Sequence, residues 1–448
     1  MVITNDAVPP PPESGYVDIS DLNTALGEPL LDSLTFLNEV AGRYPDAISF
    51  AAGRPVEDFY DVKDLVGHLH RYQEFLATEL GRSEQQIVRA LFQYGRTKGI
   101  MHELIARYLE ADEGIVVDPE SIVVTVGAQE AMYLVVRALC RDERDVALAV
   151  SPTYMGFTGA ARLAGMRVLP VASGPLGVDL DDLRSQVRSA RRLGLRPRCL
   201  YVVPDFSNPT GITLDVATRR RLLDVAGEED LLLVEDNPYG LFTGRGDRLP
   251  TLKALDREQR VVYLESFAKT TLPGARVGFV VADQRVTGDG RDSGLFADEL
   301  AKIKSMVTVN TSPLTQAVVA GQLLENDFSL ARANARPIAV YRRNLDLLLD
   351  GLRDRFSGSD GPQVCWNTPT GGFFVVLTLP FTVDDALLER SAREHGVLWT
   401  PMRHFYTDSQ GGCHQLRLSC STLTPQEIET GLDRLAAFVA AQLKPAGG

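Results

Sequence analysis

The sequence predicts an α/β protein with two parts, a large domain built on a mostly parallel seven-stranded sheet covered by helices, and a smaller α+β domain. Through the middle of the chain, short β-branched runs alternate with amphipathic stretches, which is the pattern of strands and covering helices. There are seven such runs, enough for one large sheet. The C-terminal part instead mixes two strand-like runs with two helical stretches, which favours a separate α+β unit.

We expect the seven strands of the large sheet, in chain order, at Ser121 to Val126, Asp145 to Val150, Arg167 to Val171, Cys199 to Val203, Leu231 to Glu235, Val261 to Leu264 and Val277 to Val280. In the C-terminal part we expect strands at Gly372 to Leu379 and Gln415 to Cys420, and helices at Val383 to His395 and Pro425 to Leu443.

The remaining segments suggest the domain limits. Residues 1–28 contain four consecutive prolines, which fit neither a helix interior nor a central strand, so a flexible arm is expected. Residues 29–90, helical with loops, are expected to contribute to the small domain and to the entry loop, and residues 91–330 to form the large domain. A helix from near Asp327 past Arg343 toward Leu352 should link the large domain to the small one within residues 331–448.

Composition excludes several classes of protein. The 448 residues are 44% hydrophobic and 23% charged, as in globular proteins, and the net charge of −13 disfavours nucleic acid and anionic membranes as partners. The longest apolar runs have strand length, and the N-terminus lacks the basic and apolar regions of a secretory signal. Five cysteines without a CxxC pair predict neither a metal site nor a disulfide framework, so we expect reduced thiols and a cytoplasmic protein.

Lys269 is the leading candidate for a reactive side chain. It lies among small and apolar residues in the segment Ser266 to Gly278, SFAKTTLPGARVG, which follows a predicted strand. Desolvation there would lower its pKa, and a neutral amine is the form that attacks a carbonyl cofactor. The Ser266 hydroxyl and the Arg276 guanidinium would suit a phosphate. Taken alone, such a residue would more often be a surface lysine after a strand.

This segment resembles the Schiff-base lysine motif of the fold-type I, class I/II aminotransferases, which depend on pyridoxal 5′-phosphate (PLP). The resemblance runs from about residue 30 to residue 440 and implies an aspartate aminotransferase-like fold. It also implies that Lys269 anchors the cofactor and acts as acid and base, and that Ser266 and Arg276 bind the cofactor phosphate.

Further motifs occur in the order that this family has. By the resemblance, Asn208 in the segment DFSNPTG and Tyr239 in EDNPY share the phenolic oxygen of the cofactor, and Asp236 pairs with the ring nitrogen. Tyr154 would stack on the ring. In isolation, Asp236 could be a helix cap or a loop charge, and either tyrosine could be ordinary packing.

A phosphate cradle is expected where a strand enters a helix at Thr125 to Ala131. Glycine permits the turn, and the first helical amides are free to hold an anion. The resemblance assigns Gly127, Ala128 and Gln129 to the phosphate. Ala128 and Ala268 stand where relatives often have serine, so one or two phosphate hydrogen bonds would be missing.

Three residues are expected to complete the site. Arg417 in QLRLS would grip the substrate carboxylate through a bidentate fork, with Asn208 beside it, and Gly53 would let backbone approach the same carboxylate. Tyr94 in QYG would reach the phosphate of a neighbouring subunit, which implies a homodimer with composite active sites.

The resemblance implies a ping-pong transfer of an amino group between an amino acid and a 2-oxo acid. The same residues serve PLP-dependent lyases and oxidases, and a ligand-sensing regulator with an aminotransferase-like domain is a further alternative. The chain is also loosely similar to actinobacterial aminotransferases for non-proteinogenic amino acids such as hydroxyphenylglycines, which would suggest an aromatic or arylglycine substrate and secondary metabolism. Aromatic residues that could line such a pocket, or belong to the core, are Phe59, Tyr60, Phe373 and Phe405.

Overall fold

A computed structural model describes residues 17–27, 31, 39–40, 42–174, 177–244, 246, 248–288, 291–357, 364–407 and 411–443. The proline run of the expected arm lies outside these residues. The end of that arm forms two 3₁₀ turns, η1 (Ile19–Asp21) and η2 (Thr24–Gly27).

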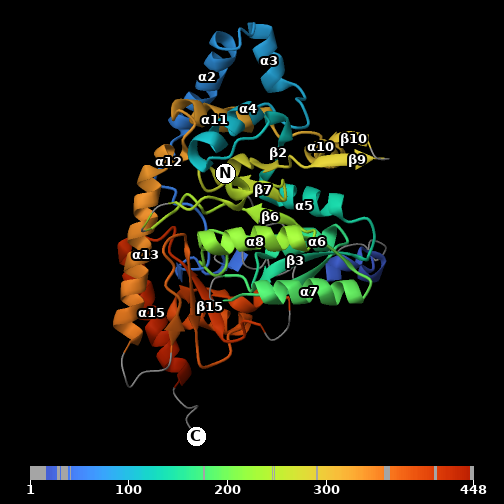
Figure 1. Cartoon of the computed structure of the whole chain (residues 1–448). Helices are drawn as coiled ribbons and strands as arrows, with labels where there is room; N and C mark the ends of the chain where they lie inside the picture. Colours follow the sequence, from blue (N-terminus) through green and yellow to red (C-terminus); the bar gives the residue numbers. More distant parts are fainter. Residues whose placement is uncertain are drawn as a thin grey trace.

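A seven-stranded sheet forms the centre of the large domain (Figure 1). Its strands, in the spatial order β2-β8-β7-β6-β5-β3-β4, are β2 (Ile122–Thr125), β8 (Gly278–Val281), β7 (Val261–Ser266), β6 (Leu232–Asp236), β5 (Arg196–Val202), β3 (Asp145–Ser151) and β4 (Arg167–Ala172). Neighbouring strands are parallel except at β8, which is antiparallel to both β2 and β7. The connection from β7 to β8 is too short for a crossover helix, so β8 returns antiparallel. The predicted sheet is confirmed, with a strand at each expected place.

Both faces of the sheet are covered by helices, because alternate residues of a strand point to opposite faces. On β5, Cys199 and Tyr201 belong to the core beneath α5 and α6, whereas Leu200 and Val202 belong to the core beneath α7 and α8. The helices of the large domain are α4 (His102–Tyr108), α5 (Gly127–Leu139), α6 (Met155–Leu163), α7 (Leu180–Arg192), α8 (Val216–Glu228), α9 (Leu252–Leu255), α10 (Phe296–Val307) and α11 (Pro313–Glu325). A hairpin of β9 (Arg285–Gly288) and β10 (Arg291–Leu295) precedes α10.

The linker is two helices rather than the single predicted one. A short helix, α12 (Leu330–Ala333), stops at Asn334, and α13 (Ala335–Phe356) then runs along the side of the molecule (Figure 1). The Asn334 amide donates to the carbonyl oxygens of Leu330 and Thr270, at 2.9 and 2.8 Å. This side chain therefore ties the junction to the turn that follows Lys269.

The small domain has a four-stranded antiparallel sheet with its own hydrophobic core. Its strands, in spatial order, are β11 (Cys365–Trp366), β12 (Phe374–Thr378), β15 (Gln415–Ser419) and β14 (Thr400–Pro401). The two strands and the helix α15 (Pro425–Leu443) lie where the sequence predicted them. The predicted helix at 383–395 is instead α14 (Asp385–Arg390) followed by a π-helical turn, Ser391–His395, which ends at Gly396 with a φ of 63°.

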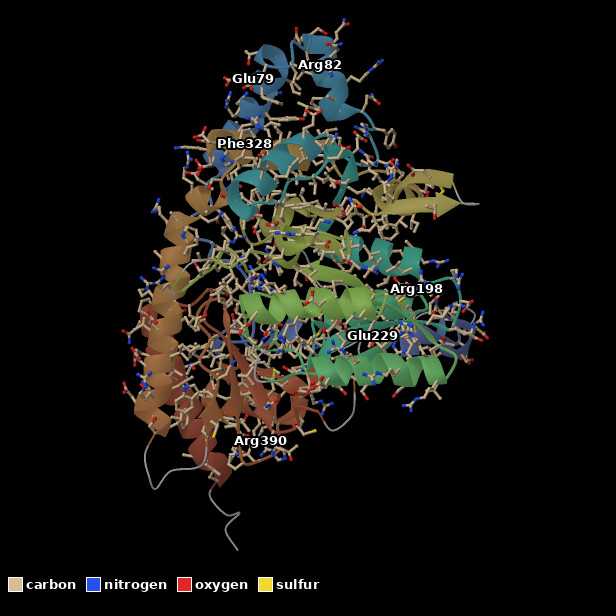
Figure 2. All side chains as sticks on the ribbon, in the orientation of Figure 1. Glu79, Arg82, Arg198, Glu229, Phe328 and Arg390 are labelled. Atoms are coloured by element: carbon tan, nitrogen blue, oxygen red, sulfur yellow. The ribbon has the colours of Figure 1, made fainter. Side chains whose placement is uncertain are left out.

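The N-terminal segment reaches both domains. Strand β1 (Ile48–Ser49) pairs in parallel with β13 (Val397–Leu398) of the small domain. The helices α2 (Val62–Thr78) and α3 (Glu84–Phe92) form a hairpin that projects beyond the sheet, with Glu79 and Arg82 near its tip (Figure 2). The domain limits taken from the sequence stay a prediction. In the part of the chain that the structure describes, no helix is long and apolar enough to cross a membrane.

Candidate active site

The predicted site residues gather at one edge of the large sheet. The strands β2, β5, β6 and β7 run in the same direction, because β2 and β7 are both antiparallel to β8, so their carboxyl ends meet at this edge. A cavity lies there, between the sheet and the small domain. It is lined by Gly53, Ala128, Gln129, Met132, Tyr154, Val203, Asn208, Asp236, Pro238, Tyr239, Ser266, Ala268, Lys269, Arg276, Phe374 and Arg417.

Lys269 places its amine inside this cavity. Its Nζ donates a hydrogen bond of 2.6 Å to the carbonyl oxygen of Gly53. Burial lowers the pKa of Lys269 to about 8, and the positive charges of Arg417, Arg276 and Arg54 act in the same direction. About a tenth of the amine is therefore neutral and nucleophilic at pH 7, far more than for an ordinary lysine.

Asp236, the last residue of β6, is buried with half of its carboxylate unpaired. The Tyr201 hydroxyl donates to Oδ2 at 2.7 Å, while Oδ1 has no hydrogen-bond partner. Burial raises the pKa of Asp236 to about 7, and the Tyr201 hydrogen bond opposes that rise. A buried acceptor without a partner is costly, so this oxygen is suited to a cationic or N–H donor from a ligand.

Arg417 comes from β15 of the small domain and completes the opposite wall. Its guanidinium donates to the carbonyl oxygen of Ala51 at 2.8 Å, to Thr400 Oγ1 at 3.2 Å and to Asn208 Oδ1 at 2.5 Å. Its Nε has no partner, and burial lowers its pKa to about 10. A buried guanidinium that meets only neutral acceptors favours an incoming carboxylate.

Aromatic rings surround the same guanidinium. Its Cζ lies 4.3 Å from the centre of the Phe374 ring and 5.0 Å from that of Phe405. Gly53 is required beside Phe374, because a Cβ at position 53 would lie 2.6 Å from the ring carbon Cζ. Phe373, the neighbour of Phe374, lies in the core, edge-on to Tyr239 with ring centres 5.4 Å apart.

The turn from β2 into α5 forms a cradle under Arg276. Gly127 has a φ of +73°, and a Cβ there would lie 2.5 Å from Arg276 Nη2, so glycine is needed for both the backbone and the space. The first amides of α5 have no acceptor within the helix and can bind an anion. Ser266, also in the lining, accepts a hydrogen bond from the Ala268 amide at 3.2 Å.

Gln129 and Tyr154 lie side by side at the wall between α5 and α6. The Gln129 amide donates to the carbonyl oxygen of Gly156 at 2.7 Å, and a Cβ at Gly156 would collide with both side chains. Burial raises the pKa of the Tyr154 hydroxyl, and so it does for Tyr239. Both phenols therefore stay protonated and can donate hydrogen bonds to a ligand.

Tyr94 is a predicted site residue that is absent from the lining of this cavity. It follows α3 and is 85% exposed. Gly127 is absent from the lining itself but forms the backbone turn behind Arg276.

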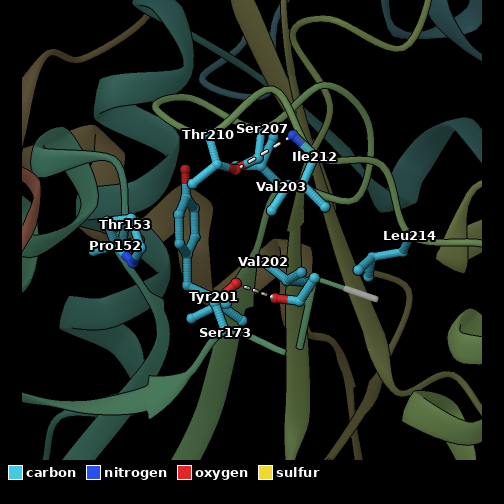
Figure 3. A pocket seen from close by; sticks show the side chains of 12 residues that line it. Pro152, Thr153, Ser173, Tyr201, Val202, Val203, Ser207, Thr210, Ile212 and Leu214 are labelled. Atoms are coloured by element: carbon cyan, nitrogen blue, oxygen red, sulfur yellow. Dashed lines mark hydrogen bonds between the residues drawn. The ribbon is translucent and has the colours of Figure 1, made fainter. Parts of the chain in front are cut away.

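Sequence reasoning missed Tyr201 and Phe374. Tyr201 is two positions from Cys199 on β5, on the face that carries Asp236, so strand alternation could have identified it. Its ring stacks on Phe157 with centres 4.1 Å apart. A second, smaller cavity beside Tyr201 lies between β3 and the loop after β5 and is lined by the hydroxyl residues Thr153, Ser173, Ser207 and Thr210 (Figure 3).

The charges of the main cavity favour an anionic ligand. Its lining contains the cations Lys269, Arg276 and Arg417 but one acid, Asp236. Within the described residues, no group of three or more His, Cys, Asp or Glu side chains is arranged to hold a metal ion. The arrangement can hold two anionic groups, at Arg276 and at Arg417, with an amine and a buried acid in the same lining.

Comparison with known proteins agrees with this arrangement. The model of the family "aminotransferase class I and II" matches residues 72–435. The (S)-3,5-dihydroxyphenylglycine transaminase of Amycolatopsis orientalis is 54% identical over 431 residues, which cover 96% of each chain.

Two solved structures are similar throughout. The kynurenine aminotransferase of Pyrococcus horikoshii, solved in complex with PMP, has a TM-score of 0.79 at 26% identity and covers 95% of this chain and 98% of its own. The aspartate aminotransferase of Thermus thermophilus with maleate has a TM-score of 0.72 at 23% identity, covering 93% and 99% of the two chains. The latter similarity concerns the fold, and it confirms the fold class predicted from the sequence.

Proposed function

We propose that this chain, which belongs to the class I and II aminotransferase family and is a transaminase, carries PLP on Lys269 and exchanges the amino group of an arylglycine with a 2-oxo acid. The transaminase activity follows from the family and from the 54% identity over nearly the whole of a transaminase. Transaminase activity is therefore preferred to the alternatives of a lyase, an oxidase or a regulator. The cofactor, the roles of the residues, the amino acid and the assembly are the proposal.

The cavity suits PLP on three counts. Lys269 offers an amine whose pKa is lowered to about 8. Asp236 Oδ1 is buried without a partner in the cavity lining, where a protonated ring nitrogen would supply one. The turn at Gly127, beneath Arg276, leaves helical amides available to a phosphate. When bound, PLP supplies an electron sink that stabilises negative charge at the substrate Cα.

The site residues would have the following roles. Lys269 binds the cofactor covalently and moves the proton of the substrate Cα, and Asp236 keeps the ring nitrogen protonated. Asn208 and Tyr239 hydrogen-bond the phenolic oxygen, and Tyr154 stacks on the ring.

Anion binding would occupy the two ends of the cavity. Ser266 and Arg276, with the Gly127, Ala128 and Gln129 turn, hold the phosphate. Arg417 binds the substrate carboxylate, with Asn208 and Gly53 beside it. Ala128 and Ala268 lack hydroxyls, so the phosphate would depend more heavily on Arg276 and the backbone amides.

An arylglycine is proposed as the amino acid because of the 54% identical dihydroxyphenylglycine transaminase. The aromatic rings of Phe374 and Phe405 around Arg417 support it. In an arylglycine the ring is bonded directly to Cα, so a ring seated near the carboxylate anchor would meet these aromatic walls.

A homodimer is proposed because Tyr94 is 85% exposed and absent from the lining of its own cavity. Phe92 and Val88 on α3 are also exposed, at 70% and 51%, which supports burial of this face by a second copy. Tyr94 would then reach the phosphate in the partner's cavity.

Absorbance spectroscopy of the purified protein, reconstituted with PLP, tests the proposal. Each amino acid is added without a 2-oxo acid, and the panel is (S)-3,5-dihydroxyphenylglycine, (S)-4-hydroxyphenylglycine, (S)-phenylglycine and phenylalanine. We expect the visible band of Lys269-bound cofactor to convert to the near-ultraviolet band of pyridoxamine phosphate, fastest with the hydroxylated arylglycines. Lys269→Ala should not convert. No visible band after PLP is supplied would refute the cofactor, and equal or faster conversion with phenylalanine would refute the arylglycine.

A further inference from the structure

A buried ion pair lies directly behind the cradle at the start of α5. Lys304 of α10 is fully buried, and its Nζ donates to Glu130 Oε2 at 2.7 Å and to Thr308 Oγ1 at 3.0 Å. The Thr308 hydroxyl in turn donates to Glu130 Oε1 at 2.6 Å. Both oxygens of the Glu130 carboxylate are therefore satisfied from α10 and the residue that follows it.

Glu130 also fixes the cradle. It is in the first turn of α5, and its Oε2 accepts the backbone N–H of Val126 at 2.6 Å. Val126 immediately precedes Gly127, whose φ of +73° directs the chain beneath Arg276. The carboxylate thus holds the turn in the shape that leaves the next amides exposed to an anion.

The position of Glu130 creates an electrostatic conflict with any phosphate bound there. A carboxylate and a phosphate at the same helix N-terminus both bear negative charge, and they repel each other strongly where water is excluded. The ammonium of Lys304 cancels the charge of Glu130. Lys304 is not part of the cavity lining, and its contact with Glu130 is the route by which it would influence a bound phosphate.

We infer that Lys304 is a positioning residue for the phosphate of the cofactor: it neutralises Glu130, so that this carboxylate shapes the cradle without repelling the phosphate. The inference rests on the proposed function, because PLP supplies the phosphate. It adds to that function a residue that no sequence motif identified.

The test measures the affinity of apo-protein variants for PLP and for pyridoxal, which has the same ring but no phosphate. Lys304→Met should weaken PLP binding by about tenfold or more, because it removes the cation that compensates the buried negative charge of Glu130 near the phosphate. Pyridoxal affinity should change by less than about twofold. A purely structural role of Lys304 would weaken both ligands equally, and that result would overturn the inference.

A charge-neutralising series adds a second prediction, with the opposite sign. Glu130→Gln keeps an acceptor for Val126 and removes the negative charge, so PLP should bind at least as tightly as to the wild type. The double variant Glu130→Gln/Lys304→Met should recover the wild-type affinity to within about threefold. Weaker binding in Glu130→Gln, or no recovery in the double variant, would overturn the inference, and both variants remain informative if Lys304→Met does not fold.

Two controls separate the possible failures. Lys302→Met, on the same helix but exposed and paired with Glu299, should change neither affinity. If the wild type binds no PLP, the proposed cofactor fails, and inorganic phosphate then decides the inference. Thermal stabilisation by inorganic phosphate that is strong for the wild type and weak for Lys304→Met would support it, and equal stabilisation would overturn it.

Discussion

Replacement of Asp236 by asparagine should change how the stability of the apo-protein depends on pH. The pKa of this buried carboxyl is raised from 3.8 to about 7, so the folded chain holds a proton that the unfolded chain releases. The stabilisation is therefore greatest at acidic pH and is lost as the pH rises toward about 7. Between about pH 5 and about pH 8, the wild type should lose about 2.5 kcal/mol more unfolding free energy than Asp236→Asn.

Urea denaturation of apo-protein, followed by circular dichroism across this range, measures the difference. Glu235 and Glu265 are also buried, with pKa values raised to about 8, so the wild-type curve alone would not isolate Asp236. The difference between the two proteins does, because asparagine keeps the shape and an acceptor for Tyr201. Asp181→Asn, at a fully exposed side chain, is the matched control and should run parallel to the wild type.

Parallel curves for the wild type and Asp236→Asn would refute the reasoning, since they would mean that Asp236 is ionised throughout in the apo-protein. Added PLP should weaken the pH dependence of the unfolding free energy of the wild type, compared with that of the apo-protein. A protonated ring nitrogen beside Asp236 lowers its pKa and removes the proton from the folded state.

Three further substitutions test the rest of the cavity. Tyr201→Phe keeps the ring and removes the hydrogen bond to Asp236, so the affinity for PLP should fall by about tenfold in an absorbance titration. An unchanged affinity would contradict the role of this hydrogen bond. Arg417→Lys loses the forked geometry of the guanidinium, so the KM for the amino acid should rise by about tenfold or more while the affinity for PLP stays unchanged. An unchanged KM would exclude Arg417 as the carboxylate anchor. Gly127→Ala strains a backbone with a φ of +73° and places a methyl group against Arg276. The melting temperature of the apo-protein and its affinity for PLP should therefore both fall. A fully active and equally stable variant would contradict the cradle geometry.

The large sheet could be predicted because strands such as β2, β3 and β7 are short, largely buried and mostly apolar runs that contain β-branched residues, a local pattern that needs no knowledge of the rest of the chain. Local sequence patterns predicted helix limits less well where contacts between distant residues ended or divided a helix. Asn334 divides the linker because its amide bonds to Thr270, which is distant in sequence. The predicted helix at 383–395 ends in a π-turn for which the sequence carries no periodic signal.

The sequence by itself predicted which residues gather at the cavity, because Lys269, Asn208 and Gly127 follow strands of one sheet, Asp236 ends another, and strands of one direction end at one edge. Only the tertiary structure decided how these residues are charged and paired. The pKa of Lys269, the unpaired oxygen of Asp236 and the contact of Arg417 with Asn208 all depend on burial and on the small domain closing over the sheet. Desolvation and contacts between distant segments set these properties, and neither is a function of local sequence.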